Sequence, residues 1–425
     1  MSASKLIYLD ANATTPVCAE ALAALLPLLS DHFGNPSSSH SLSAEPAAAL
    51  SLARRRIAAL VGASLPDGDR VIFCSCATES IAWIFRGLVE GAATRARGGL
   101  GPAHIVAGAT EHVAVLECLR WAESAPVGAR VTRVDAGADG RVDAELFAAA
   151  AAASPDTVLV SLMLANNETG ALNDVARAAR LICAAAAAAH RPPPFIHCDA
   201  SQACGKISVN LHALGVDGLT LAGHKLYAPK GVGATVLRAG ATLPRPLLLG
   251  GSQEGGARAG TENVAFAAAL GASAEVAQQW LTEQDGVACH TALRARLAET
   301  LTHKLKAANR NILIHGPTNP QHTLPNTLSF GVSGLRASAL VRVLHDSVAL
   351  SAGSACHAGD TEHASHVLAS MGRGGAAAAA GGVDIFNDFA RGTLRLSLAR
   401  GSTEDDIDIA AQLIVDAVIS LTSPV

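Results

Sequence analysis

The stretch FIHCDASQACGKISVNLHALGVDGLTLAGHK, residues 195–225, contains the pattern that decides the fold. Its two apolar runs, FIHCDAS (195–201) and GLTLAG (218–223), lack the two-residue alternation of half-exposed strands, as expected of strands covered on both faces. Similar runs occur at RVIFCS (70–75), HIVAG (104–108), TVLVSLML (157–164) and GATVLR (233–238). Because these runs alternate with helical stretches, the sequence predicts an α/β domain with a mainly parallel central sheet covered by helices.

The sequence changes character after about residue 265. A long helical stretch, AFAAALGASAEVAQQWLTEQ (265–284), is followed by mixed strand and helix patterns, LPNTLSFGV (324–332), ALVRVLHD (339–346) and GTLRLSLAR (392–400). We therefore predict two domains. The large domain is expected over 16–265, and a smaller α+β domain is expected from 1–15 together with 266–425.

The composition favours a small-molecule function in a reducing compartment. The chain has 425 residues and a formal net charge of −4, which leaves room for two lobes and gives no basic field for nucleic acid. No stretch approaches the roughly 18 strongly apolar residues of a membrane span. Nine cysteines occur without a CxxC pair, and the opening MSASKLIYLD enters a strand-like run without a leader pattern. We expect a cytoplasmic protein that binds neither nucleic acid nor membrane.

Two chemically distinctive residues follow neighbouring predicted strands. Asp199 ends FIHCD, and Lys225 comes just after GLTLAG. Ligands of open α/β sheets bind beyond the carboxyl ends of the strands, so both side chains are expected at one site. This pair suits pyridoxal 5′-phosphate, whose aldehyde binds a lysine covalently and whose pyridinium nitrogen pairs with an aspartate. The local sequence also fits a capped strand and a surface lysine, and it leaves both interpretations open.

A second candidate element is SCATES (75–80), which we call the phosphate turn. It lies between the run RVIFCS and the helical IAWIFRGL. A strand, a turn of small residues and a helix present backbone N–H groups and a positive dipole end to an anion, and Thr78 adds a hydroxyl. Serine and threonine also cap helices that bind no ligand, so this pattern by itself is weak.

Taken together, the chain resembles the cysteine desulfurase and selenocysteine lyase family, in the class V group of fold-type I pyridoxal phosphate enzymes. The resemblance runs nearly end to end, through YLDANATTP (8–16), FGNPSS (33–38), ATES (77–80), TEHVAV (110–115), MLANNETG (163–170), HCDASQACGK (197–206), AGHKLYAPKGVGA (222–234), RAGTENV (258–264), SAGSACHAG (351–359) and TLRLSLARGSTEDDID (393–408). It implies the fold-type I fold, with 16–265 as the cofactor-binding domain. MLANNETG, HCDASQACGK and LGVDGLTLAGHK (214–225), with Ala222 where many desulfurases have serine, look most like the selenocysteine lyase branch.

The resemblance also implies roles for individual residues. Lys225 would be the cofactor lysine, Asp199 its pyridinium partner, and His112 would lie over the cofactor ring and handle protons. Thr261 would reach the phosphate of the neighbouring subunit, which implies a homodimer. The other implied cofactor contacts are Asn167 and Gln202 near the ring and Ala77, Thr78 and His224 at the phosphate.

Substrate binding and sulfur or selenium transfer fall to further residues. Arg395 would pair with the substrate carboxylate through two parallel bonds, a geometry that lysine cannot supply, and Asn167 would help orient the substrate. Cys356, in SAGSACHAGD (351–360), would take sulfur or selenium from L-cysteine or L-selenocysteine and leave L-alanine. The resemblance places Cys356 on a loop of the small domain, and an acceptor protein for its cargo is a candidate partner.

Two departures from the family pattern stand out. Cys76 replaces a glycine in the phosphate turn, which adds a side chain where the backbone approaches the phosphate. The run GRGGAAAAAGG (372–382) is typical of an insertion and lengthens the link between Cys356 and Arg395.

Other interpretations remain open on local grounds. His112 fits a core histidine, Asn167 and Gln202 fit polar turn residues, and Arg395 fits the solvated face of a strand. The alternative functions are a cysteine desulfurase that supplies iron–sulfur clusters or tRNA thiolation, another class V aminotransferase or lyase, and a catalytically silent partner on a sulfur scaffold. Transamination does not need a cysteine at position 356, so Cys356 favours a cysteine desulfurase over another class V aminotransferase.

Overall fold

The computed structural model describes residues 6–96, 102–353, 365–373 and 389–422. Cys356 and most of the 372–382 run lie outside these residues.

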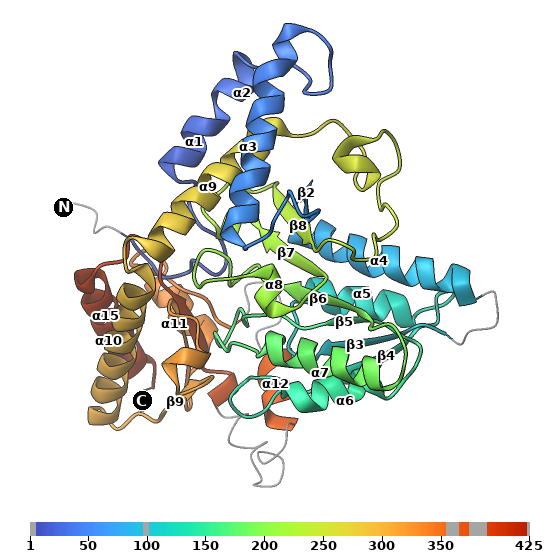
Figure 1. Ribbon diagram of the computed structural model, residues 1–425. Coiled ribbons are helices and arrows are strands. Elements are labelled where there is room, and N and C mark those ends of the chain that lie inside the picture. Colours follow the sequence, from blue (N-terminus) through green and yellow to red (C-terminus); the bar gives the residue numbers. More distant parts are fainter. Residues whose placement is uncertain (1–5, 97–101, 354–364, 374–388, 423–425) are drawn as a thin grey trace.

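A seven-stranded sheet forms the centre of the molecule (Figure 1). Its strands, in spatial order, are β2 (Arg70–Cys74), β8 (Gly233–Leu237), β7 (Gly218–Ala222), β6 (Phe195–Asp199), β5 (Thr157–Ser161), β3 (His104–Gly108) and β4 (Arg130–Val134). Neighbours are parallel except where β8 pairs antiparallel with β2 and β7. Strands β3, β6, β7 and β8 are buried along their whole length, which explains their apolar runs without alternation.

The predicted α/β fold with a mainly parallel sheet is confirmed. The runs that the sequence marks as strands form β2, β3, β5, β6, β7 and β8. Strand β4, RVTRV, was not predicted, because this edge strand carries two arginines and is partly exposed along its length.

Helices cover both faces of this sheet (Figure 1). On one face, α4 and α5 bury residues such as Phe85 and Leu119 against Ile105 of β3. On the other face, α3, α6, α7 and α9 bury residues such as Phe147 and Ile182. The bounds are α3 (Ala44–Leu60), α4 (Ala77–Ala96), α5 (Val113–Glu123), α6 (Ala144–Ala152), α7 (Val175–Ala188) and α9 (Val264–Thr282). In the described part of the chain, no helix is long and apolar enough to cross a membrane.

A second core lies around a smaller sheet. Its strands are β12 (Thr393–Ser397), β10 (Thr327–Val332) and β9 (Ile312–His315), all antiparallel, while β1 (Ile7–Tyr8) pairs in parallel with β11 (Val348–Ala349). The helices are α10 (Gly286–Ala307), α11 (Ala337–Leu344) and α15 (Glu404–Thr422). Phe330, Leu396 and Ile414 are among the side chains of this core. The N-terminal strand therefore packs with elements from the far end of the chain.

Two elements beyond residue 265 bury side chains against the large sheet. Leu270 of α9 and Met371 of α12 (His366–Arg373) belong to the same apolar cluster as Val160 of β5. The boundary at residue 265 stays a prediction from the sequence. We propose that α9 and α12 belong to the core of the large domain.

Buried histidines are a recurrent feature of both cores. His197 on β6 hydrogen-bonds with Ser161 through Nδ1 (2.9 Å) and with Thr220 through Nε2 (3.0 Å). Burial lowers the pKa of His197 to about 4, and the nearby Asp199 charge only partly opposes this effect. Burial likewise lowers the pKa to about 4 for His112, His224, His290 and His315.

We therefore expect the cofactor-free protein to lose stability as the pH falls from about 6.5 towards 4. In this window the unfolded chain protonates imidazoles of ordinary pKa, whereas the folded chain keeps them neutral, so the unfolded state binds more protons. Between pH 7 and pH 5 this difference amounts to about 2 kcal/mol for one fully buried histidine such as His197. Urea unfolding at pH 7, 6 and 5 measures it. His197→Gln should show a shallower pH dependence, and equal slopes for both proteins would contradict the assignment.

Candidate active site

The parallel strands β3, β5, β6 and β7 end at one edge of the central sheet. His112 follows β3, Asn167 follows β5, Asp199 ends β6, and Lys225 follows β7. Strand β2 runs in the same direction, because both β2 and β7 are antiparallel to β8, and it leads into the phosphate turn at this edge. The sheet topology thus gathers residues that are far apart in the sequence.

Asp199 and Lys225 form the charged centre of this edge. Asp199 is buried, and its Oδ1 accepts a hydrogen bond from the backbone N–H of Ser201 (2.9 Å). Lys225 ends a short 3₁₀ turn, η2 (Gly223–Lys225). Their charges act on His112 in opposite directions, since Lys225 lowers its pKa and Asp199 raises it. Both groups are therefore neighbours of the same imidazole.

His112 is held as a neutral imidazole at the start of α5. Its Nδ1 accepts a hydrogen bond from the backbone N–H of Ala114 (3.1 Å), so the neutral ring carries its hydrogen on Nε2. Burial, followed by the charge of Lys225, lowers its pKa to about 4. His112 therefore caps α5 and also lies beside Lys225 and Asp199. This position distinguishes it from a histidine that only fills the core.

The neighbouring Glu111 is a buried carboxyl group that the sequence did not single out. Its Oε1 accepts a hydrogen bond from the backbone N–H of Met163, and its Oε2 has no hydrogen-bond partner. Burial and then the Asp199 charge raise its pKa well above the ordinary value. Burial therefore favours the protonated form of Glu111.

The N-terminal segment packs on the lysine turn. The backbone carbonyl of His224 accepts hydrogen bonds from the N–H and Oγ1 of Thr15 (both 2.9 Å), and His224 Nδ1 bonds with Thr14 Oγ1 (3.2 Å). Burial and then the charge of Lys225 lower the pKa of His224 to about 4. His224 is thus neutral beside the lysine.

The phosphate turn packs tightly on the first residue of β8. A Cβ added to Gly233 would lie 3.0 Å from the carbonyl carbon of Cys76 and 3.2 Å from the nitrogen of Ala77. Ala77 and Thr78 open α4, where helical N–H groups have no partner within the helix. Cys76 is not among the described residues with a positive φ, so the cysteine adds no left-handed strain to the turn.

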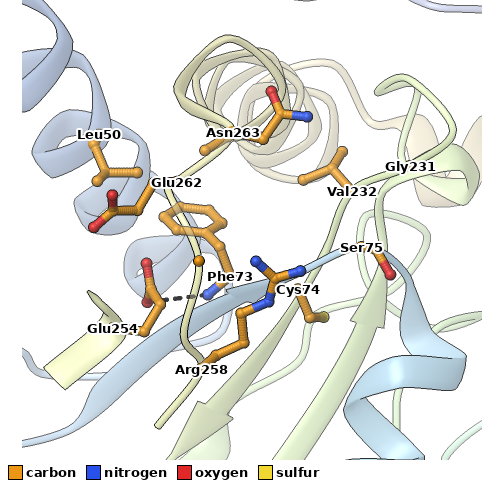
Figure 2. A pocket seen from close by; sticks show the side chains of 12 residues that line it. Leu50, Phe73, Cys74, Ser75, Gly231, Val232, Glu254, Arg258, Glu262 and Asn263 are labelled. Carbon is orange, nitrogen blue, oxygen red and sulfur yellow. Dashed lines mark hydrogen bonds between the residues drawn. The ribbon is translucent and has the colours of Figure 1, made fainter. Parts of the chain in front are cut away.

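A small pocket adjoins the phosphate turn (Figure 2). Its volume is about 110 Å³, and its lining includes Cys74 and Ser75 together with Arg258, Gly260 and Glu262. Figure 2 shows the guanidinium of Arg258 beside Cys74. Arg258 Nε donates to Glu79 Oε1 (2.9 Å), and Glu79 Oε2 accepts from the N–H of Ser75 (2.7 Å). Glu79 therefore ties the phosphate turn to the segment that carries Thr261.

Arg395 is a buried arginine with one donor group unused. Its side chain is 2% exposed, so the solvated strand face considered from the sequence is wrong. Nη2 donates to Asp10 Oδ1 (2.8 Å) and Nη1 donates to the backbone carbonyl of Asn167 (3.0 Å), whereas Nε has no partner. The N-terminal segment and the Asn167 loop therefore meet at this guanidinium.

Three other predicted residues have different surroundings. Gln202 is buried, and its amide bonds with Asn12 and Lys206, not with Lys225 or Asp199. Thr78 and Thr261 are exposed, and Thr261 makes none of the described contacts with Lys225 or Asp199. A role for Thr261 in the neighbouring subunit stays a prediction.

Cys356 lies outside the described residues, but residues on both sides of its segment are described. On one side, the backbone of Ser351 pairs with that of Arg395 (2.8 and 3.2 Å). On the other side, His366 Nε2 donates to the backbone carbonyl of Glu111 (2.9 Å). The chain therefore enters the segment next to Arg395 and leaves it next to Glu111 and His112.

Several buried polar residues of this region were not predicted individually. Asp10 and Asn12 belong to YLDANATTP and Lys206 belongs to HCDASQACGK, so their motifs were noticed but no role was given to these side chains. The only sequence signal for them is a polar residue inside an otherwise apolar or small-residue motif.

Comparisons with known proteins identify the family of the chain. The family described as Aminotransferase class-V matches residues 7–409. The chain is 38% identical over 410 residues to cysteine desulfurase 2 of Trichormus variabilis, covering 96% of this chain and 92% of that protein. It is 36% identical over 405 residues to cysteine desulfurase NifS of Azotobacter vinelandii, covering 95% and 90%.

Solved structures show the same fold. A NifS-like protein superposes with a TM-score of 0.81 at 30% identity, covering 97% of this chain and 99% of that chain. A protein named SspA, in complex with cysteine, superposes with a TM-score of 0.70 at 27% identity, covering 93% and 99%. The chain belongs to the class-V aminotransferase family and has the fold-type I fold, as the sequence resemblance indicated. Within that family, the relatives named above are cysteine desulfurases.

Pyridoxal 5′-phosphate is the cofactor of this family, and the residues at the sheet edge fit it. Asp199 is buried, and its side chain accepts one described hydrogen bond. Asp199 and Lys225 both shift the pKa of His112, so the two residues lie near the same imidazole. The close packing of Gly233 on the phosphate turn holds the first N–H groups of α4 at this edge. We propose that Lys225 holds the cofactor aldehyde, Asp199 its ring nitrogen, and Ala77, Thr78 and His224 its phosphate.

Proposed function

We propose that the protein removes sulfur from L-cysteine and releases L-alanine, with the sulfur held on Cys356 as a persulfide. The observation that carries this proposal is the position of the described residues that flank the Cys356 segment, since Ser351 pairs with Arg395 and His366 bonds with Glu111. Cys356 stands between these two anchors in the sequence, which supports it as the acceptor of sulfur from a substrate held by Arg395. The names of the relatives support sulfur as the atom transferred.

The buried cations favour an amino-acid substrate. Arg395 has an unused Nε donor and one carboxylate partner, Asp10, so it can accept the substrate carboxylate as a second anion. Burial raises the pKa of Asp10 more than Arg395 lowers it, which weakens Asp10 as a competing counter-ion. Asn167, whose carbonyl already binds Arg395, would orient the substrate from the same loop.

When bound, the cofactor supplies an electron sink for the charge that develops at the substrate Cα. Lys225, once displaced by the substrate amine, would take the proton from Cα. His112, neutral at physiological pH, can accept a proton near the reacting groups and return it. The Cys356 thiolate would form a bond to the substrate sulfur as the Cβ–S bond breaks. The electron pair of that bond stays with the three-carbon fragment, which takes up protons and leaves as alanine.

Selenium is a second cargo that we propose for the same site. The motifs MLANNETG and HCDASQACGK and the residue Ala222 support it, since they resemble the selenocysteine lyase branch. A selenol ionises more readily than a thiol, so selenocysteine makes a smaller demand on the position of Cys356.

We also propose that the enzyme is a homodimer that hands its cargo to an acceptor protein in the cytoplasm. Leu22, Leu26 and Leu29 of α1 (Ala19–Leu25) and its continuation, with Phe33, are exposed apolar side chains close together in the sequence. A second copy of the chain would cover them and bring its cofactor phosphate to Thr261. Sedimentation of the purified protein gives its stoichiometry.

The test of the proposed function is alanine formation by the purified protein with added pyridoxal phosphate. We expect alanine and sulfide from L-cysteine in the presence of a thiol reductant, and alanine and selenide from L-selenocysteine. Pyruvate as the product, or a requirement for an oxo acid, would identify another class V activity. A protein that binds the cofactor and turns over neither amino acid would be the silent partner. The ratio of the two kcat/KM values decides between the branches.

A further inference from the structure

Lys206 is a buried lysine that the proposed reaction does not use. It is 7% exposed, and its Nζ donates to Asn12 Oδ1 (2.7 Å) and to Gln202 Oε1 (2.6 Å). Both acceptors are neutral amide oxygens, and none of the ion pairs of the described residues includes Lys206. Burying an ammonium without a counter-ion is unfavourable, so the position of Lys206 calls for an explanation.

The two bonds of Lys206 fix the orientation of two amides. In either protonation state the amine has at least two hydrogens, and it donates both to amide oxygens, so Gln202 and Asn12 each turn their oxygen towards it. The nitrogen of Gln202 then lies on the other side and donates to the backbone carbonyl of Asn12 (3.0 Å). The nitrogen of Asn12 likewise donates to Thr327 Oγ1 (2.8 Å). The amine of Lys206 thus orients both amides, with their oxygens towards Lys206 and their nitrogens away from it.

Gln202 is the amide that matters for the cofactor. It lies three residues after Asp199, in the turn at the edge of the sheet. Its Nε2 carries two hydrogens, of which one binds Asn12 and the second has no acceptor among the described residues. If the amide turned over, an acceptor oxygen would take the place of this donor. Gln202 Oε1 would then face an oxygen atom of the ligand, and the two acceptors would repel each other.

We propose that Lys206 is a positioning residue that holds Gln202 with its N–H donor, and not its oxygen, towards the ring oxygen of pyridoxal phosphate. This proposal rests on the cofactor assignment and not on the identity of the substrate. The amine can make both bonds whether charged or neutral, because each form has at least two hydrogens. Burial, followed by the charges of Lys225, Arg395 and Arg400, lowers the pKa of Lys206, and the bracing survives the loss of its proton.

The experiment compares Lys206→Met with Lys306→Met, which removes an exposed lysine of α10. The readouts are the visible absorbance band of the bound cofactor, its dissociation constant, and the thermal midpoint of the cofactor-free protein. We expect Lys206→Met to shift the band and weaken cofactor binding by about tenfold, since a hydrogen bond to an ionised oxygen contributes at this level. Lys306→Met should match the wild type in all three. A Lys206→Met protein with an unchanged band and dissociation constant would overturn the proposal.

A double-mutant cycle with Gln202→Met separates positioning from simple destabilisation. If Lys206 acts through Gln202, Lys206→Met should change cofactor binding by less than about twofold once Gln202 is gone. Independent, multiplying effects would refute the proposal. If Lys206→Met does not fold, Lys206→Gln, which keeps an N–H donor, enters the same cycle and should retain most of the wild-type band. Absence of any cofactor band in the wild type would instead count against the cofactor assignment itself.

Discussion

Lys225→Ala is expected to lower kcat for alanine formation by about 10³-fold or more and to remove the visible band of the covalently bound cofactor. Lys225 would both hold the cofactor and move the Cα proton, so no other side chain supplies its role. Lys206 cannot replace it, because its amine is committed to Asn12 and Gln202. Absorbance spectra and single-turnover assays of the purified variant measure both effects.

The control for this prediction is Lys230→Ala. Lys230 is exposed and lies five residues further along the same loop. It lowers the pKa of His224 through its charge but makes none of the described hydrogen bonds to the site. Lys230→Ala should keep the cofactor band. A Lys225→Ala protein that retains the band and turns over cysteine at a rate near that of the wild type would show that another amine binds the cofactor.

The sequence was sufficient for the residues that follow from strand order. Asp199 and Lys225 each stand at the end of a recognisable strand, and parallel neighbours end at the same edge, so their proximity follows from the fold. His112 needed the family resemblance, because a lone histidine carries no pattern. Its cap bond and its lowered pKa depend on tertiary burial.

The polar contacts between distant segments could not be predicted in the same way. Arg395 pairs with Asp10 across 385 positions, and Lys206 pairs with Asn12 across 194. Periodicity reports which face of an element is apolar, but it carries no information about which buried polar groups meet. Arg395 shows the consequence. Strand alternation allowed a solvated face, whereas the N-terminal segment and the Asn167 loop bury the guanidinium.

These contacts also connect the two cores. Asn12 bonds with Lys206 and Gln202 of the large sheet region and with Thr327 of β10 in the small sheet. Asp10 and Arg395 make a parallel link nearby. The substrate arginine and the cofactor-side glutamine are therefore braced by one N-terminal segment. A substitution at Asn12 is expected to disturb both.

Cys356→Ala is expected to lower alanine formation from L-cysteine by about 10³-fold while leaving the cofactor band unchanged. This variant lacks the thiol to which the substrate sulfur is assigned, whereas Lys225, Asp199 and Arg395 are intact. The matched controls are Cys183→Ala and Cys289→Ala, which remove exposed cysteines of α7 and α10. Both should retain wild-type turnover. Alanine formation is measured with each amino acid, and persulfide on the protein is followed by mass spectrometry after one turnover.

The two substrates should respond differently to the loss of Cys356. The Cβ–Se bond is weaker than the Cβ–S bond, so turnover of L-selenocysteine should fall by a smaller factor than turnover of L-cysteine. An equal loss with both would mean that Cys356 takes part in a step common to both substrates. Undiminished desulfuration by Cys356→Ala would remove Cys356 as the nucleophile.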